Sequence, residues 1–311
     1  MKLSVLSMMV LLVGAPAIGR AQDSENKGPD LESTYQSLKD AQAKGDAAAV
    51  KKLVAETSAL ARKAAAEPAP EDADEKDGWT KRVAYAKDVD AQTEYALYDV
   101  ALKSPPAEMV DLLAALEAQN PKCKYLNEAY ASYLYALSQS GGSAKITGVA
   151  EKALTNFPDN TDLLLVMVNS TFSAKQSDRA QGYANRLVAA MSKKSKPEGI
   201  SEADWEKQKT SSLGRGYWVS GMVSGEKNQY AAADKSLRAA MPYIKGNNAM
   251  MAPALFYLGV ANYNLGKMTM SKAKILEGAK FSDDCAAIPG DLAQQAWKNS
   301  ALMKAEAAKM R

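Results

Sequence analysis

The stretch Leu258–Lys267, near the C-terminus, reads LGVANYNLGK and decides the fold. It joins the end of a helical run to a turn at Gly266-Lys267. Weaker copies of this helix-then-turn pattern extend back through most of the 311-residue chain. A pattern repeated at this period predicts a stack of helical hairpins, which usually serves as a surface for holding other molecules and seldom as a reaction centre.

Two units near the C-terminus fit a 34-residue repeat best, Gly214–Asn247 and Ala252–Cys285. Small residues recur at the eighth, twentieth and twenty-seventh positions, where the two helices of a hairpin and the next helix should pack closely. The twenty-fourth position is bulky, as Leu237 in one unit and Ile275 in the other. The small positions hold Gly221, Ala233 and Ala240 in the first unit, and Gly259, Ser271 and Gly278 in the second.

Four further units precede these two. Asn127–Asn160 and Thr161–Lys194 follow each other without a gap, whereas Leu31–Ala64 and Asp90–Cys123 fit the repeat less well. The series resembles the tetratricopeptide repeat (TPR) family in its exported bacterial form. The resemblance implies an all-α, TPR-like α-solenoid of about six helical hairpins, closed by a capping helix near the C-terminus. A composition rich in Ala, Leu, Lys, Glu, Gln and Met also favours helix throughout.

Irregular stretches suggest how the chain is divided. We expect a signal peptide over residues 1–21, an N-terminal helical hairpin with an acidic linker over 22–89, and TPR-like repeats over 90–194. A linker over 195–213 and the last repeats with the capping helix over 214–311 complete the organisation. The acidic linker is the segment Glu67–Gly78. Within the second linker, Ser201–Asp204 resembles a capping box that opens a short helix.

The first residues predict export. Lys2 precedes the apolar run Leu3–Val13, and small residues lead to Ala21, after which we expect cleavage. An uncleaved membrane anchor is the alternative, but a bilayer span needs about 20 apolar residues. No later segment is long and apolar enough, so we expect no transmembrane segment in the mature chain. The protein should therefore be periplasmic or secreted.

The charge balance and the absence of histidine limit the function. Without Lys2 and Arg20, 37 of the 39 basic residues remain against 36 acidic ones, so we expect no nucleic-acid partner. The chain has no histidine, which removes the commonest general base and the commonest zinc ligand. No constellation of carboxylates or lysines suggests catalysis either. We therefore expect no enzyme, no catalytic residue, no cofactor and no metal site.

The two cysteines, Cys123 and Cys285, fall at the ends of units four repeats apart. Stacked repeats keep such positions far apart, while a disulfide needs Cα atoms within about 7 Å. We expect two separate cysteines, with a bridge as the alternative in an oxidising compartment.

The TPR resemblance also implies a binding surface. In that family the first helix of each unit lines a concave groove, through its fifth, ninth and twelfth positions. Carried onto this chain, those positions predict an aromatic and nearly uncharged groove that suits a protein or an extended peptide, of the cell envelope if the chain is exported. The predicted groove residues are Tyr98, Tyr135, Asn169, Phe172, Trp218, Met222, Phe256 and Tyr263, with Leu165 and Val260 beside them.

Three alternatives stay open for these residues. The same rings could pack between helices, because spacing alone does not separate a core stripe from a binding stripe. They could stack on sugars in a glycan- or nutrient-capture protein, although such a site should place Asp, Asn or Arg beside them. An enzyme would instead need a deep pocket with two carboxyl groups of raised pKa.

One short motif, Gly214-Arg215-Gly216, falls at the start of a predicted helix. Free backbone N–H groups at a helix start can bind an anion. A plain turn into the helix is the simpler interpretation.

Overall fold

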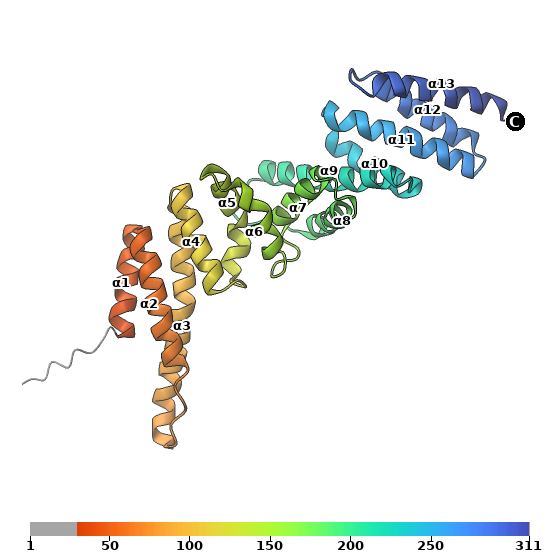
Figure 1. The fold of residues 1–311 in the computed structure, drawn as a ribbon. Helices are drawn as coiled ribbons and strands as arrows, with labels where there is room; N and C mark the ends of the chain where they lie inside the picture. Colours follow the sequence, from red (N-terminus) through yellow and green to blue (C-terminus); the bar gives the residue numbers. More distant parts are fainter. Residues whose placement is uncertain (1–29, 311) are drawn as a thin grey trace, which may run out of the picture.

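The computed structural model describes residues 30–310, and the signal peptide expected over residues 1–21 lies outside them. Within this range the chain forms thirteen α-helices, one short 3-10 helix and no strand (Figure 1). The α-helices are α1 (Leu31–Lys44), α2 (Ala47–Ala65), α3 (Ala73–Lys103), α4 (Pro106–Gln119), α5 (Lys124–Gln139), α6 (Ile146–Ala153), α7 (Thr161–Ser173), α8 (Ser177–Lys193), α9 (Glu202–Glu226), α10 (Tyr230–Ile244), α11 (Asn248–Met268), α12 (Lys272–Ala286) and α13 (Ala293–Lys309).

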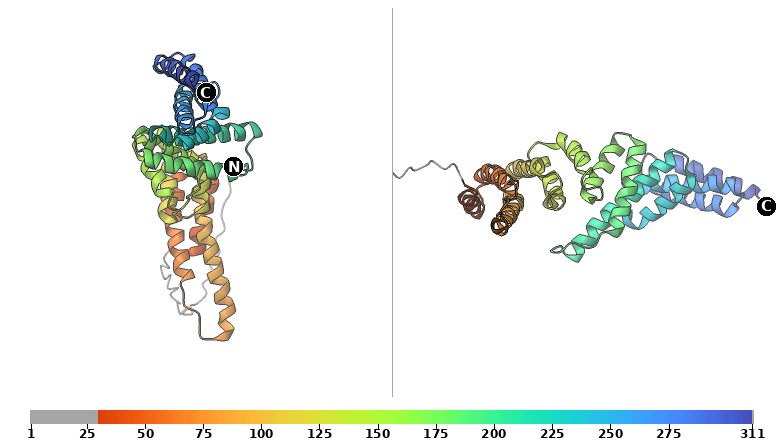
Figure 2. Two further views of the ribbon diagram at one scale, coloured as in Figure 1. Left: turned by 90° about the vertical axis from the view of Figure 1, so that its right-hand side faces the viewer. Right: turned by 90° about the horizontal axis from the view of Figure 1, so that it is seen from below.

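The helices pack as consecutive pairs, from α1 with α2 to α11 with α12, and α13 follows as a single helix. The described chain is therefore an all-α solenoid of six hairpins and one C-terminal helix, as the sequence predicts. Figure 2 shows the hairpins following one another along an elongated stack. One continuous hydrophobic core runs from Leu38 to Leu258.

Five of the six hairpins use the same turn. A residue just after the first helix is left-handed, and the next residue donates its N–H to the carbonyl oxygen five residues back. This bond satisfies a carbonyl that the helix end would leave free. The second hairpin differs because Pro106 has no N–H to donate. The left-handed residues are Gly45, Gly141, Lys175, Asn228 and Met270, and the donors are Asp46, Gly142, Gln176, Gln229 and Ser271.

The odd-numbered helices form the inner layer of the stack. From α1 to α13, each of them contacts the next odd-numbered helix directly. Among the even-numbered helices only α2 and α4 touch, so this layer is spread apart. A stack whose two layers are unequally spaced curves toward the closer layer, and the exposed side chains of α3, α5, α7 and α9 therefore line its inner face.

The linker expected over 195–213 is mostly helical. Ser201 caps α9 by accepting a hydrogen bond from Asp204 N, as the capping box predicts, but the helix continues for 25 residues. Trp205 and Leu213 are buried against Met191 of α8. Residues 202–213 therefore belong to α9 and are not an irregular linker.

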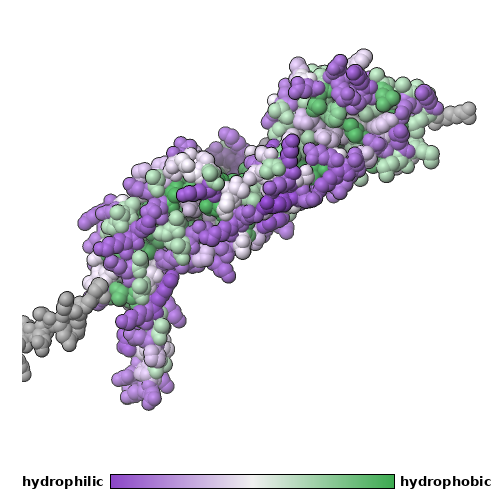
Figure 3. All heavy atoms as spheres, in the orientation of Figure 1, coloured by the Kyte–Doolittle hydropathy of each residue, from purple (hydrophilic) through white to green (hydrophobic). Residues whose placement is uncertain are grey.

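The acidic linker is also shorter than expected. Asp72 caps α3, and Asp74 and Glu75 occupy its first turn, where negative charge is favourable, so the helix begins at Ala73. The first turns of α3 project from the stack and carry mainly hydrophilic side chains (Figures 1 and 3). Trp79 Nε1 donates to Glu67 O at 3.0 Å and ties this projection to the preceding segment.

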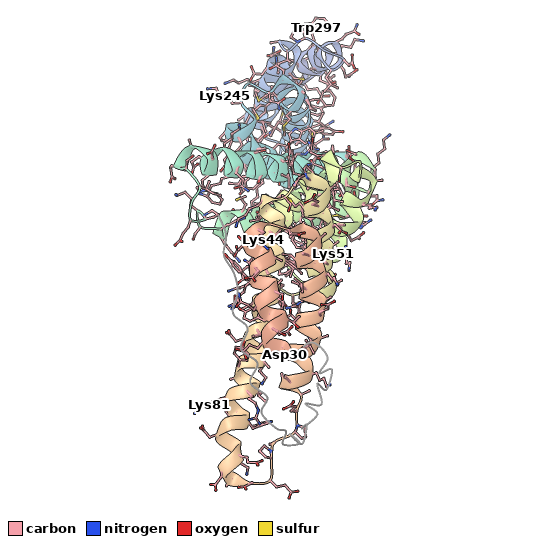
Figure 4. All side chains as sticks on the ribbon, turned by 90° about the vertical axis from the view of Figure 1, so that its left-hand side faces the viewer. Asp30, Lys44, Lys51, Lys81, Lys245 and Trp297 are labelled. Atoms are coloured by element: carbon pink, nitrogen blue, oxygen red, sulfur yellow. The ribbon has the colours of Figure 1, made fainter. Side chains whose placement is uncertain are left out.

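The last helix, α13, ends the stack with a partly apolar outer face. Lys304 of α13 pairs with Asp283 of α12 at 2.7 Å, and Ser300 donates to the same carboxylate. Trp297, labelled in Figure 4, is 64% exposed and Leu302 is 53% exposed, so the outer face of α13 is not wholly polar. Between residues 30 and 310, no helix combines the length and hydrophobicity needed to cross a bilayer.

The close contact of α11 with α12 gives a first test. A Cβ atom added at Gly278 would lie 2.8 Å from Gly259 O and 2.9 Å from Tyr263 N, so the two backbones must move apart to accept it. We expect Gly278→Ala to lower the free energy of unfolding by about 1–3 kcal/mol, measured by urea denaturation. Gly182→Ala on the exposed face of α8 meets nothing within 4 Å and should raise it by roughly 0.5–1 kcal/mol. Equal effects of the two substitutions would contradict the close contact.

Candidate functional site

Two hollows lie beside α7 and α9. The first, of about 1010 Å³, is lined mainly by the segment 156–160 after α6, the end of α8 and the segment 197–200, with a few residues of α5, α7 and α9. The second, of about 610 Å³, lies among α7, α9, the end of α10 and the start of α11. Gln208 Nε2 donates to Asp162 Oδ1 at 3.3 Å, and both residues line the first hollow but not the second. Because α7 and α9 contribute residues to both hollows, we call the two hollows together the groove.

A group of tyrosines continues this face toward the N-terminus. We call Tyr95, Tyr98, Tyr125 and Tyr135 the tyrosine patch. Tyr98 stacks on Tyr125 with ring centroids 5.1 Å apart, and Tyr95 lies 5.6 Å from Tyr125. Tyr135 is 66% exposed on α5. Tyr95, Tyr98 and Tyr125 form one aromatic cluster, and Tyr135 is a separate exposed ring about three turns further along α5.

Glu128 connects the tyrosine patch to the first hollow. Tyr98 Oη lies 3.5 Å from Glu128 Oε2, and Glu128 also lines the hollow. Burial, followed by the charge of Glu128, raises the pKa of Tyr98, so this hydroxyl stays protonated at neutral pH. The first hollow carries four carboxylates and two lysines. They are Glu128, Asp159, Asp162 and Glu198, and Lys193 and Lys194.

The second hollow combines apolar, polar and charged residues. Leu165, Tyr243 and Met250 supply apolar surface, Asn169 supplies an amide, and Glu206, Lys207 and Arg215 supply charged groups. The Arg215 guanidinium lies 5.0 Å from the centroid of Trp218 and 5.4 Å from that of Phe172. Arg215 Nε donates to Asn169 Oδ1 at 2.7 Å. Arg215 is therefore held between two rings and an amide at the wall of the groove.

Two glycines place Arg215. A Cβ atom at Gly214 would lie 2.8 Å from Tyr243 Cβ, and one at Gly216 would lie 2.7 Å from Val188 Cγ2. The glycines let α9 sit close to α10 on one side and to α8 on the other, which leaves the side of α9 toward α7 for Arg215. The expected helix start at this motif is wrong, because it lies in the middle of α9 and its N–H groups belong to the helix.

Several predicted groove residues reach this surface. Leu165 and Asn169 line the second hollow, and Tyr135 is exposed. Tyr98 and Phe172 are half-buried, with Tyr98 in the tyrosine patch and Phe172 against Trp218. The inner face that sequence spacing predicts is thus partly assembled.

Trp218 and Met222 are core residues. Each is only 7% exposed and belongs to the continuous hydrophobic core. Trp218 Nε1 donates to Met250 O at 2.9 Å, which fixes the ring between α9 and α11. The groove assignment of these two residues is corrected, because too little of their surface remains for a partner to touch.

Phe256 and Tyr263 mainly pack α11 against the last two helices. Phe256 adjoins the buried cluster around Leu255 and Cys285, and Tyr263 adjoins the cluster of α12 and α13 around Ile275. Both are half-buried. They lie away from the two hollows, so the structure does not join them to the other predicted groove residues.

Tyr125, Glu128 and the Arg215 side chain belong to this surface although the repeat positions do not predict them. Arg215 lies three residues before Trp218, which places the two side chains on neighbouring turns of one helix face. That spacing is the signal in the sequence that could have identified the pair.

The two cysteines line neither hollow. Cys123 and Cys285 are buried and unbridged, as expected. Burial raises the pKa of Cys123 to about 12, so its thiol is inert at neutral pH. Among residues 30–310, no group of three or more His, Cys, Asp or Glu residues is placed to hold a metal ion.

Comparison with known proteins adds no family to this description. No protein-family model matches the chain, and a search of curated proteins finds no match. The resemblance to TPR proteins therefore depends on the repeat positions and on the helical hairpins alone.

The correction at Trp218 is testable. Trp218→Ala removes a buried indole and its hydrogen bond, so we expect the free energy of unfolding to fall by about 3–5 kcal/mol in urea denaturation. Tyr135→Ala removes an exposed aromatic ring and should change it by less than about 0.5 kcal/mol. A Trp218→Ala protein as stable as the parent would contradict the core assignment and support the groove assignment of this ring.

Proposed function

We propose that this protein is an exported, non-catalytic interaction scaffold, which binds a protein or an extended peptide in the inner groove of a TPR-like solenoid. One observation carries the proposal: α5, α7 and α9 contribute residues to the two hollows, and the tyrosine patch lies on α3 and α5. A pre-formed surface of this kind places most of the ordering cost of binding on the partner.

The lining of the groove supports an extended peptide as the ligand. Peptide backbone needs partners for its N–H and C=O groups, and the amides of Asn127, Asn169 and Gln208 lie along the two hollows. Leu165, Tyr243 and the tyrosine patch offer apolar surface to alternate side chains. Polar groups that hydrogen-bond to the peptide backbone, together with aromatic residues that contact its side chains, are typical of peptide grooves.

Glycan capture is the second candidate. Sugar sites combine an aromatic platform with Asp, Glu, Asn or Arg, and Tyr98 beside Glu128 provides one such combination. Phe172 beside Asn169 and Arg215 provides another. The peptide proposal is preferred because Trp218, the largest ring beside Asn169 and Arg215, is buried and cannot stack on a sugar.

Export to the periplasm, or secretion, belongs to the same proposal. It depends on Lys2, the apolar run Leu3–Val13 and the small residues before Ala21. N-terminal sequencing of the protein recovered from its native host should begin at Gln22. A mature protein that begins at Met1 would contradict export by this route.

Site-specific photo-crosslinking tests where the partner binds. Benzoylphenylalanine in place of exposed Tyr135 lies on the inner face, whereas the same group in place of exposed Lys235 lies on α10 in the outer layer. After irradiation of envelope extracts, mass spectrometry should identify the same protein or peptide adduct at position 135 in independent preparations, and not at position 235.

Two outcomes would count against the peptide proposal. Equal adducts at positions 135 and 235 would mean that the inner face has no special role. Absence of adducts at position 135, together with binding on a glycan array that Tyr135→Ala weakens, would favour the second candidate.

A further inference from the structure

Arg215 differs from other arginines of the described chain. Arg62, Arg179 and Arg238 each pair with a carboxylate, whereas Arg82, Arg186 and Arg215 pair with none among residues 30–310, and of these three only Arg215 is not fully exposed. Arg215 is also half-buried, and burial lowers the pKa of its guanidinium. A partly desolvated charge without a counter-ion is costly, and a bound anion would offset that cost.

The surroundings hold this guanidinium in one position. It lies against the rings of Trp218 and Phe172, and those rings contact each other edge to face at 5.3 Å. Trp218 is fixed in turn by its bond to Met250 O. The guanidinium is therefore pre-organised, so a ligand would bind it with little further loss of side-chain freedom.

Asn169 adds a second donor at the same place. Arg215 Nε can only donate, so Asn169 must turn its oxygen toward it and its NH₂ group away. That NH₂ group has no partner in the described chain, and Asn169 is exposed in the second hollow. The terminal nitrogens of Arg215 and this amide together offer donors to one carboxylate.

We propose that Arg215 and Asn169 bind the carboxylate of an Asp or Glu side chain within an extended partner segment. This rests on the proposed function, and it names the chemistry that the groove selects. Leu165, Tyr243 and Met250 adjoin the site, so an apolar residue of the partner should lie next to the acidic one.

Two features favour an internal acidic side chain over a free C-terminal carboxylate. The second hollow is lined by Glu206 and Lys207, about two turns before Arg215 on α9, and by Asn247 at the start of α11, so it extends beyond Arg215. The first hollow carries four carboxylates against two lysines, so a second acidic residue there would be repelled. The acidic residue of the partner should therefore lie at the Arg215 site, where Lys207 offsets the charge of Glu206.

A positional-scanning library of octapeptides, acetylated and amidated at their ends, tests the proposal even while the partner is unidentified. Binding to the full chain is measured by fluorescence anisotropy. We expect one position of the library to prefer Asp and Glu over Asn and Gln. The best peptide should lose roughly ten- to hundredfold in affinity when its acid is replaced by the amide. A version of that amide-substituted peptide with a free C-terminal carboxylate should not regain the lost affinity.

Matched variants assign the effect to Arg215. Arg215→Gln should remove the preference for an acid, while Arg82→Gln, at an exposed position on the projecting part of α3, removes the same charge and should change nothing. Asn169→Asp supplies Arg215 with an internal carboxylate and should also abolish the preference, at an unchanged or raised melting temperature. This last variant keeps the test valid if Arg215→Gln folds poorly.

Each other outcome has a distinct meaning. Peptides that bind without preference for an acid, or an acid preference that survives Asn169→Asp, would overturn the proposed Arg215 site and leave the peptide groove intact. If a peptide with a free C-terminal carboxylate binds as tightly as one with an internal acidic side chain, the preference for an internal side chain would be wrong. Failure of every peptide to bind would overturn both this inference and the peptide form of the proposed function.

Discussion

Close approach of neighbouring helices is the constraint on which the rest of the structure depends. At Gly259 and Gly278 the backbones of α11 and α12 nearly touch, and at Gly214 and Gly216 α9 is held between α10 and α8. Such contacts fix the rotation of each helix about its own axis, because a Cβ atom at the contact would collide with the neighbour. Once the rotation is fixed, the side chains that face the inner groove are determined as well.

The same constraint explains how a charged group is placed at the wall of an apolar core. Arg215 lies between two glycines whose contacts occupy two sides of α9, so its side chain is directed toward α7. The rings of Phe172 and Trp218 then flank the guanidinium, and Asn169 supplies an acceptor. Packing of the backbone and recognition of a ligand are therefore linked through a single helix.

Sequence spacing predicts the hairpins well and the groove only in part. The small positions Gly221, Ala233 and Ala240 are buried as expected, because the chemistry of close packing restricts residue type. The boundaries of α3 and α9 were missed, since Asp72 and Ser201 cap helices whose first turns are polar and resemble linkers. Trp218 was misassigned because inner and core stripes of one helix share the same period, and a rotation of one residue interchanges them.

This shared period also shapes how substitutions at the groove should be interpreted. Trp218 is a core residue by burial, and it is also one wall of the Arg215 site. Loss of binding after its removal would combine a global loss of stability with a local loss of pre-organisation, and the two effects are not additive for residues in contact. Substitution of Asn169 distinguishes the loss of stability from the loss of pre-organisation. Asn169 is exposed, is hydrogen-bonded to Arg215 and contributes little to the hydrophobic core. A surface residue adjacent to the core thus reports on recognition more clearly than the aromatic residue that dominates the sequence pattern.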